Sequence, residues 1–90
     1  MAFEWDEEKR LRILAERGFD LRDIVDAFAD PNGLTREDSR RNYGEQRYIM
    51  LAVSSGRLYN IVFTIRDGNI RIVTAFKANT REQRRYADNC

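Results

Sequence analysis

Three arginines in the second half of the chain, together with one glutamate, are the side chains best suited to chemistry. Arg47, Arg66 and Arg71 lie in runs where polar and apolar residues alternate, and Glu45 comes shortly before the first of them. Guanidinium groups stay charged, and their forked donors match the geometry of a phosphate group. Arginine cannot accept a proton, so Glu45 is the nearest candidate for a general base. The alternative is an ordinary cross-strand ion pair between Glu45 and Arg66.

Four more cations lie near the C-terminal end of the chain. Lys77 closes the last expected strand, and Arg81, Arg84 and Arg85 follow at the helical spacings i, i+3 and i+4. The three arginines therefore share one face of a predicted helix that has almost no apolar residue to bury. We expect these cations to grip a polyanion; the alternative is a solvated terminal helix.

The residue types that are missing narrow the chemistry further. The chain has no histidine, which excludes the commonest general base and every triad built on imidazole. Its single cysteine, Cys90, gives no disulfide framework and no thiolate cluster for zinc. The acidic residues of the first half stand at predicted helix starts and turns, so we expect neither a metal site nor a cofactor.

Charge is distributed unevenly along the chain. Residues 1–39 carry six Lys or Arg against eleven Asp or Glu, a formal −5, whereas residues 40–90 carry ten against four, a formal +6. The near-neutral total of +1 therefore conceals a basic half that can attract a polyanion, with nucleic acid the first to consider. The alternative is that two oppositely charged layers simply solvate one domain.

The length of 90 residues predicts one small domain, spanning residues 1–90. Stability at this size is marginal, so a partner chain or oligomerisation could belong to the folded state. No apolar run approaches the roughly 18 residues of a membrane span, and the first residues lack the basic-then-apolar order of a signal peptide. We therefore expect a cytoplasmic protein without a membrane partner.

The first half of the chain predicts two helices. Asp6 and the two glutamates after it are typical of a helix start, and Gly18 of a helix end. Asp20 is then expected to cap a second helix, which ends at the turn 30–33. The apolar face of this second helix comprises Leu21, Ile24, Val25 and Phe28.

The second half predicts strands followed by a helix. Residues 34–44 are expected to form an extended edge segment and a loop, and residues 45–78 a three-stranded meander with turns at 55–56 and 67–68. After the meander, Thr80 and Gln83 are spaced as a capping box. The predicted fold is therefore α+β, with two N-terminal helices packed on a small antiparallel sheet and a basic helix at the C-terminus.

The turns set the register of the meander and so decide which side chains share a side of the sheet. Two-residue turns place Thr64 opposite Arg71 and Glu45 opposite Arg66. The side facing the helices then collects Tyr48, Met50, Tyr59, Ile61, Phe63, Ile65, Ile70, Ile72 and Phe76. The other side collects Glu45, Arg47, Thr64, Arg66 and Arg71 at one end, the apolar Ile49, Leu51, Val62 and Val73 in the middle, and Lys77 toward the far end.

Seven short segments carry a family resemblance through their order and spacing. They are Phe-Glu-Trp-Asp at 3–6, Arg-Gly-Phe-Asp at 17–20, Phe-Ala-Asp-Pro at 28–31, Gly-Glu-Gln-Arg-Tyr at 44–48, Thr-Ile-Arg at 64–66, Ile-Arg-Ile-Val-Thr-Ala-Phe-Lys-Ala at 70–78 and Arg-Glu-Gln-Arg-Arg-Tyr at 81–86. Over nearly the whole chain, this series resembles the BrnT family of toxins from type II toxin–antitoxin systems.

The resemblance implies a bacterial ribonuclease of RelE-like fold that cleaves RNA and arrests translation. It also implies a cognate antitoxin of the BrnA type, which neutralises the toxin and represses the shared operon, so that DNA is met only through the antitoxin. Together with the basic side of the sheet, it leads us to expect metal-independent cleavage by attack of the 2′-hydroxyl. The expected catalytic residues are Glu45, Arg47, Arg66, Arg71 and Lys77, and the expected RNA contacts are Arg81, Arg84 and Arg85.

The chain departs from the resemblance at positions where family members often carry histidine or arginine. Arg17 and the stretch 39–43 stand where relatives often have histidines, and Phe76 stands where they often have arginine. The alternative function is therefore a non-catalytic module that binds RNA or an antitoxin on the same scaffold. Such a module would show RNA affinity that falls steeply with salt, without cleavage products.

Overall fold

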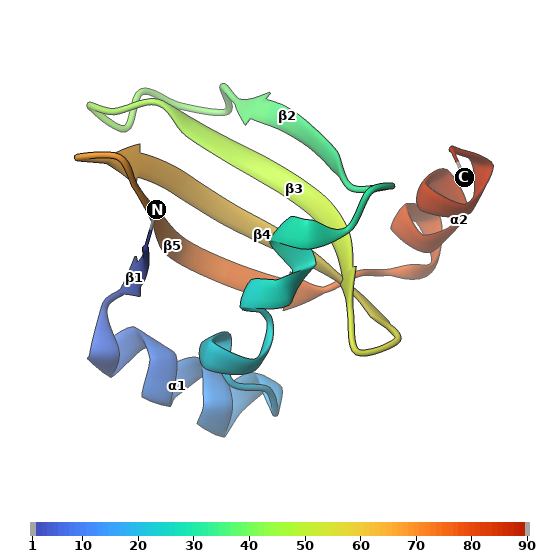
Figure 1. Cartoon of the computed structure of the whole chain (residues 1–90), viewed down its shortest axis with the longest axis horizontal. Coiled ribbons are helices and arrows are strands. Elements are labelled where there is room, and N and C mark those ends of the chain that lie inside the picture. The colour runs from blue at the N-terminus through green and yellow to red at the C-terminus, as the bar shows by residue number, and fades with distance from the viewer. Residues whose placement is uncertain (1, 90) are drawn as a thin grey trace.

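The computed structural model describes residues 2–89, which form a mixed α+β fold around a five-stranded sheet (Figure 1). The strands are β1 (Phe3–Trp5), β2 (Leu34–Asp38), β3 (Arg47–Ser54), β4 (Arg57–Arg66) and β5 (Asn69–Lys77). Their order is β1-β5-β4-β3-β2, with β1 parallel to β5 and the other neighbours antiparallel. The helices are α1 (Glu7–Arg17), two short 3₁₀ helices, η1 (Leu21–Asp23) and η2 (Val25–Ala29), and α2 (Thr80–Asp88).

Helix α1 begins and ends as the sequence predicted. The Asp6 side chain accepts a hydrogen bond from the Lys9 amide, and two glutamates occupy the first turn, near the positive end of the helix dipole. At the other end Gly18 has a φ of 78°, a left-handed conformation that favours glycine.

The second predicted helix is wrong in type, because residues 21–29 form the two 3₁₀ helices η1 and η2 instead of an α-helix. Asp20 does cap this segment, by accepting a hydrogen bond from the Arg22 amide. The physical reason for the difference is the spacing of the buried residues. Leu21, Ile24 and Ala27 stand three residues apart and are all nearly inaccessible, which suits the 3.0 residues per turn of a 3₁₀ helix better than 3.6.

The meander has the predicted two-residue turns and gains two outer strands. Ser55 and Asp67 each have a positive φ, and each is followed by a glycine with positive φ, as in a type I′ turn. The expected edge segment is present as β2, paired with β3. The pairing of β1 with β5 was not predicted, because a three-residue strand has too little alternation to be recognised and its partner lies far away in the chain.

A β-bulge in β5 reverses the predicted facing of its last residues. Ile72 and Thr74 pair with consecutive residues of β4, so Val73 between them has no partner on that strand. Every residue after the bulge then faces the opposite side. The predicted placements of Phe76 and Lys77 are therefore both wrong, because Phe76 lies on the side away from the N-terminal helices and Lys77 lies opposite the core residue Tyr59.

Helices α1, η1 and η2 cover one side of the sheet, here called the covered face, and the main core lies between them and the strands (Figure 1). Its buried residues are Ile13, Phe19, Leu21, Ile24, Ala27, Met50, Ala52, Tyr59, Ile61, Phe63, Ile70, Ile72 and Ala75. The predicted inward-facing residues of the meander belong to this core or pack against it, apart from Phe76 and Ile65. Ile65 is 52 % exposed because it lies close to the β4–β5 turn, beyond the helices.

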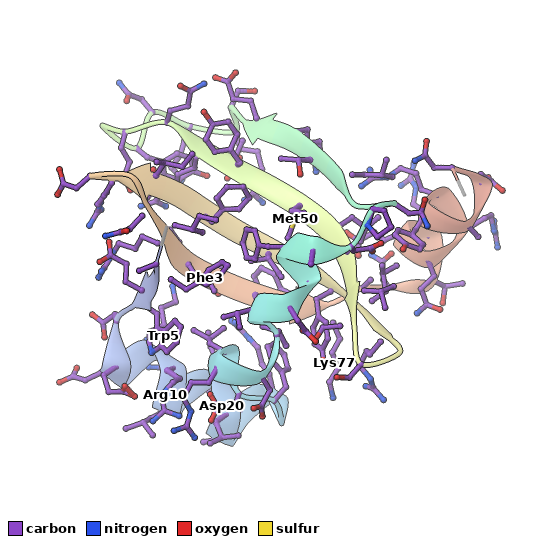
Figure 2. All side chains as sticks on the ribbon, in the orientation of Figure 1. Phe3, Trp5, Arg10, Asp20, Met50 and Lys77 are labelled. Atoms are coloured by element: carbon purple, nitrogen blue, oxygen red, sulfur yellow. The ribbon has the colours of Figure 1, made fainter. Side chains whose placement is uncertain are left out.

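One ion pair fastens α1 to η1 at the edge of this core. Arg10 Nη1 donates to Asp20 Oδ2 at 2.8 Å, and both side chains are about nine-tenths buried or more (Figure 2). Hydrogen bonds from Arg22 to the same carboxylate are the main reason that the pKa of Asp20 is lowered. Arg10 also pairs with Glu7 in the first turn of α1, so the Asp20 carboxylate ties that turn to η1. A buried pair of this kind holds its two elements in one arrangement, since a buried charge that loses its buried partner is costly.

The C-terminal helix α2 is capped one residue earlier than predicted. The Asn79 side chain accepts a hydrogen bond from the Glu82 amide, and the Glu82 carboxylate accepts one from the Asn79 amide. This complete capping box replaces the predicted one between Thr80 and Gln83, because asparagine caps at least as well as threonine and glutamate reaches back as a charged acceptor. The position of the basic helix is otherwise as predicted.

Candidate functional site

The side of the sheet away from α1, η1 and η2, here called the open face, carries the arginines singled out in the sequence. Arg71 lies opposite Thr64, and the register of β3 on β4 continues this row toward Arg47. A small cleft of about 140 Å³ at this end of the sheet, here called the arginine cleft, is lined by Asp6, Lys9, Glu45, Arg47, Arg66, Arg71, Ile72 and Val73. Four of the five expected catalytic residues are thereby brought together.

Glu45 bridges two of the arginines. Arg66 Nη2 donates to Glu45 Oε1 at 2.8 Å, and Arg47 Nε donates to Glu45 Oε2 at 3.2 Å. These hydrogen bonds, the one from Arg66 foremost, hold the pKa of Glu45 below its usual range. The cross-strand ion pair weighed in the sequence is therefore present, and while it lasts the carboxylate is a weak proton acceptor.

Arg71 is the arginine of the cleft with the loosest partner. Its Nη1 lies 4.0 Å from Glu4 Oε1 on β1, at the limit of an ion pair, and its side chain is 29 % exposed. An exposed pair at that distance contributes little to stability. Arg71 can therefore take up an anionic ligand without giving up a strong internal contact.

Lys9 is a functional candidate that the sequence analysis missed. It lines the arginine cleft from α1, and its ammonium forms no ion pair within residues 2–89. Partial burial, followed by repulsion from Arg17, Arg12 and Arg47, lowers the pKa of Lys9. No local signal marks this residue, because only the parallel pairing of β1 with β5 brings the first turn of α1 to the cleft.

The loop between β2 and β3 is fastened beside the cleft. The Arg47 guanidinium lies 4.2 Å from the centre of the Tyr43 ring, and Tyr43 Oη donates to Asp38 Oδ2 at 3.1 Å. Asp38 also accepts hydrogen bonds from Arg40, which are the main reason that its pKa is lowered. Tyr43 thus helps to fix the side chain of Arg47, one of the two arginines that hold Glu45.

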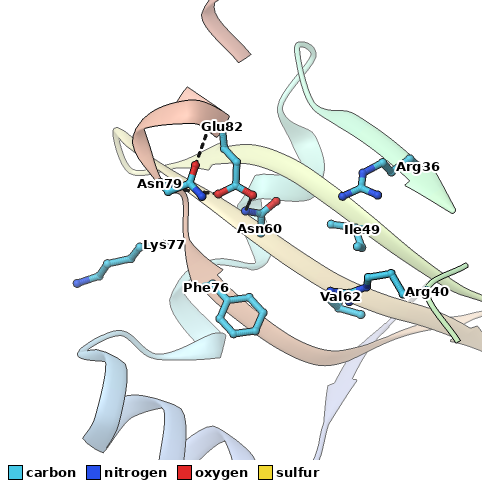
Figure 3. Close-up of a pocket in the computed structure, with 9 residues that line it drawn as sticks. All are labelled: Arg36, Arg40, Ile49, Asn60, Val62, Phe76, Lys77, Asn79 and Glu82. Atoms are coloured by element: carbon cyan, nitrogen blue, oxygen red, sulfur yellow. Dashed lines mark hydrogen bonds between the residues drawn. The ribbon is translucent and has the colours of Figure 1, made fainter. Parts of the chain in front are cut away.

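The remaining expected site residues lie outside the arginine cleft. The ammonium of Lys77 lies near Gly18, 3.9 Å from where a Cβ on that glycine would stand, and in Figure 3 its side chain points away from the other labelled residues. Arg81, Arg84 and Arg85 are exposed on α2, where they line a shallow depression with Asn79, Glu82 and Asp88. The structure therefore separates Lys77 from the proposed catalytic group and gives the arginines of α2 a surface of their own.

A second hollow, of about 260 Å³, lies on the open face between the cleft and α2 (Figure 3). Its floor includes Ile49 and Val62, which belong to the apolar middle that the sequence predicted for this side. The other lining residues are Arg36, Arg40, Asn60, Phe76, Lys77, Asn79 and Glu82. We call this feature the open-face hollow.

The described residues contain neither a metal-binding cluster nor a membrane-spanning helix. Within residues 2–89, no group of three or more Asp, Glu, Cys or His side chains is gathered as a metal ion would require. None of the helices in the same part of the chain is both long and apolar enough to cross a bilayer.

The fold and the cleft together define a small α+β domain that presents guanidinium groups for an anion. A search of curated proteins found no match. The family model for the ribonuclease toxin BrnT of type II toxin–antitoxin systems matches residues 5–82. The chain therefore belongs to the BrnT family, which confirms the resemblance read from the sequence, and an RNA substrate and an antitoxin partner follow for the family.

Proposed function

We propose that the arginine cleft is the active site of a metal-independent endoribonuclease. The observation that carries this proposal is the gathering of three arginines, a carboxylate and Lys9, which forms no ion pair within residues 2–89, around one cleft at the end of the sheet. Cleavage through the 2′-hydroxyl needs cations for the charge that grows on the phosphoryl oxygens, and one group each to remove and to supply a proton.

Substrate binding and activation of the base are coupled in this scheme. The scissile phosphate competes with the Glu45 carboxylate for Arg47 and Arg66, because both are anions that match the guanidinium fork. Once displaced, Glu45 loses the contacts that lower its pKa and becomes a better proton acceptor. The scissile phosphate thereby replaces the Glu45 carboxylate as the anion that Arg47 and Arg66 bind.

The reaction then takes one proton from the RNA and returns one to it. The 2′-oxygen attacks phosphorus, its proton passes to Glu45, and the new O2′–P bond replaces the P–O5′ bond. Lys9 supplies a proton to the leaving 5′-oxygen, a role for which a lowered pKa makes the ammonium a readier donor. The products are a 2′,3′-cyclic phosphate and a 5′-hydroxyl. Arg71 holds a phosphoryl oxygen throughout, and the arginines of α2 grip the flanking RNA.

The test is cleavage of RNA by the purified chain, with and without chelator. The Arg71→Ala variant is expected to lose about 10² or more in rate, as when one donor to a transition-state anion is removed, while its thermal unfolding stays unchanged. Arg57→Ala, which alters an exposed arginine in the β3–β4 turn region, is the matched control and should cleave normally. Full activity of Arg71→Ala would remove the site assignment.

A second candidate function is a non-catalytic module that binds RNA or antitoxin on the same surface. It is favoured by the internal neutralisation of Arg47 and Arg66 and by the apolar strip beside them, which suits an acidic amphipathic segment. RNA binding without cleavage products, measured on a purified chain that is free of any inhibitor, would establish this non-catalytic function. The BrnA-type identity of the antitoxin, the RelE-like relationship of the fold and the cytoplasmic location stay predictions.

A further inference from the structure

The open-face hollow has an aromatic wall next to an apolar floor. Phe76 is 42 % exposed, and the Arg17 guanidinium lies 4.5 Å from the centre of its ring. The floor residues Ile49 and Val62 are buried, so the base of the hollow is apolar (Figure 3). An exposed ring beside a small hollow is a stacking surface for a flat aromatic ligand.

Two hydrogen-bond acceptors are fixed at one side of this hollow. The Asn60 amide group donates to the Glu82 carboxylate, which also accepts from the Asn79 amide. Because a carboxylate has no proton to give, Asn60 must turn its Nδ2 toward Glu82, and its Oδ1 points into the hollow (Figure 3). Both Oδ1 and the spare lone pairs of the carboxylate can therefore accept hydrogen bonds from a ligand.

The opposite rim, on β2, supplies a free cation. Arg36 lies opposite Ile49 and forms no ion pair within the described residues 2–89, whereas Arg40 beside it is held by Asp38 at 2.8 Å. A guanidinium that has no internal partner can donate to acceptors on a ligand, and guanidinium groups pair with the O6 and N7 acceptors of guanine.

We propose that the open-face hollow binds a nucleobase of the RNA, with guanine preferred. The ring stacks on Phe76, its N1–H and N2–H₂ donors meet Glu82 and Asn60, and Arg36 meets O6 or N7. The volume of about 260 Å³ lies below the range of drug-sized ligand sites and suits one ring system. Adenine, cytosine and uracil do not offer two adjacent N–H donors beside an acceptor edge of this kind.

The hollow stands at a distance from the arginine cleft that suits a neighbouring nucleotide. Asn60 and Thr64 are four residues apart on β4, which corresponds to about 13 Å along a strand. The base in the hollow therefore belongs to a nucleotide flanking the scissile phosphate. This inference rests on the proposed function, because the nucleic-acid ligand is taken from it.

The experiment separates base recognition from cleavage. Binding of GMP, AMP, CMP and UMP, none of which can be cleaved, is measured by titration calorimetry, and cleavage positions are mapped on an RNA of mixed sequence. GMP is expected to bind best. Phe76→Leu should weaken binding about tenfold or more, and Glu82→Gln should remove about tenfold of the preference for GMP, since glutamine keeps the helix cap but presents a donor.

Matched controls and opposing outcomes follow from the same measurements. Ile65→Ala removes an apolar side chain of similar exposure from the neighbouring strand β4, outside the hollow, and it should leave both binding and cleavage positions unchanged. Equal binding of all four nucleotides, or cleavage positions that Phe76→Leu and Glu82→Gln do not alter, would overturn the inference while cleavage itself upholds the proposed function. GMP preference without any RNA cleavage would uphold the inference about the base and overturn the proposed nuclease.

Discussion

The two sides of the sheet differ in burial and in charge. On the covered face, alternate residues of β3, β4 and β5 meet the N-terminal helices and are almost completely buried. On the open face, the intervening residues include arginines that meet carboxylates of neighbouring strands and loops, and only a narrow apolar strip lies between the arginine cleft and α2. Alternate residues of the same strands therefore form a buried core on one side and, on the other, the charged surface that we propose binds RNA.

The two faces of the sheet also differ in how they accommodate charged side chains. The covered face admits the buried pair of Arg10 with Asp20, which Glu7 and Arg22 extend. The open face holds its charges in pairs that, in our proposal, an incoming anion exchanges. Substitutions on the first side should change the free energy of unfolding. Substitutions on the second should change binding and cleavage.

The largest effect is expected for the buried pair. Asp20→Asn removes the buried charge partner of Arg10 and leaves it only the largely exposed Glu7 within residues 2–89, so the free energy of unfolding should fall by about 3–5 kcal/mol. Urea unfolding followed by circular dichroism measures it. Asp23→Asn, which alters an exposed carboxylate of the helix η1 that Asp20 caps, is the control and should stay within about 0.5 kcal/mol. A loss below 1 kcal/mol in Asp20→Asn would contradict this account of the covered face.

The next effect compares two isoleucines of β4. Ile61 is 0 % exposed in the core, whereas Ile65 is 52 % exposed near the turn. Ile61→Ala should lower the free energy of unfolding by about 2–5 kcal/mol, and Ile65→Ala by about 0.5 kcal/mol or less. An equal loss of unfolding free energy in the two variants would contradict the account in which the helices bury Ile61 but not Ile65.

A third prediction concerns the internal anion of the open face. Glu45→Gln removes the charge that Arg47 and Arg66 share, so affinity for a non-cleavable DNA oligonucleotide of matching sequence should rise several-fold at low salt, while RNA cleavage falls. Fluorescence anisotropy at two salt concentrations measures the first and gel analysis the second. Glu37→Gln, an exposed carboxylate on β2 opposite Tyr48, should change neither. Unchanged affinity in Glu45→Gln would count against competition between carboxylate and phosphate.

The smallest effect is the dependence of stability on pH. The pKa of Asp20 in the folded chain is lower than its unfolded value of about 3.9, so its ion pairs contribute fully above about pH 4. That contribution is lost as the pH falls from there through the folded pKa. Unfolding midpoints measured between pH 6 and pH 3 should therefore drop more steeply in the parent chain than in Asp20→Asn. Parallel curves would contradict it.

Several local features were readable in the sequence because they depend on neighbouring residues, although the cap of α2 and the helix type of residues 21–29 were not. The caps at Asp6 and Asp20, the end of α1 at Gly18 and both two-residue turns follow from such signals. The placement of Glu45 beside Arg66 also follows, because a turn of fixed length sets the register of the strands that it joins.

Features that depend on distant pairing were not readable. The bulge at Val73 carries no residue type that marks it, yet it moved Phe76 to the open face and Lys77 away from it. The parallel strand β1 likewise brought Lys9 to the arginine cleft without a local signal. One extra residue in a strand is enough to exchange two faces, which is why the predicted site lost one cation and the open face gained an aromatic ring.

By itself, the sequence determined the kinds of groups available to this BrnT-family chain: arginines and carboxylates without histidine, on strands joined by tight turns. Tertiary structure alone decided which of those groups share a surface. The physical reason is that side-chain direction alternates along a strand, so each long-range pairing and each bulge selects between two opposite faces. The sequence supplies the residues of the cleft and of the hollow, and the pairing of the strands brings them together.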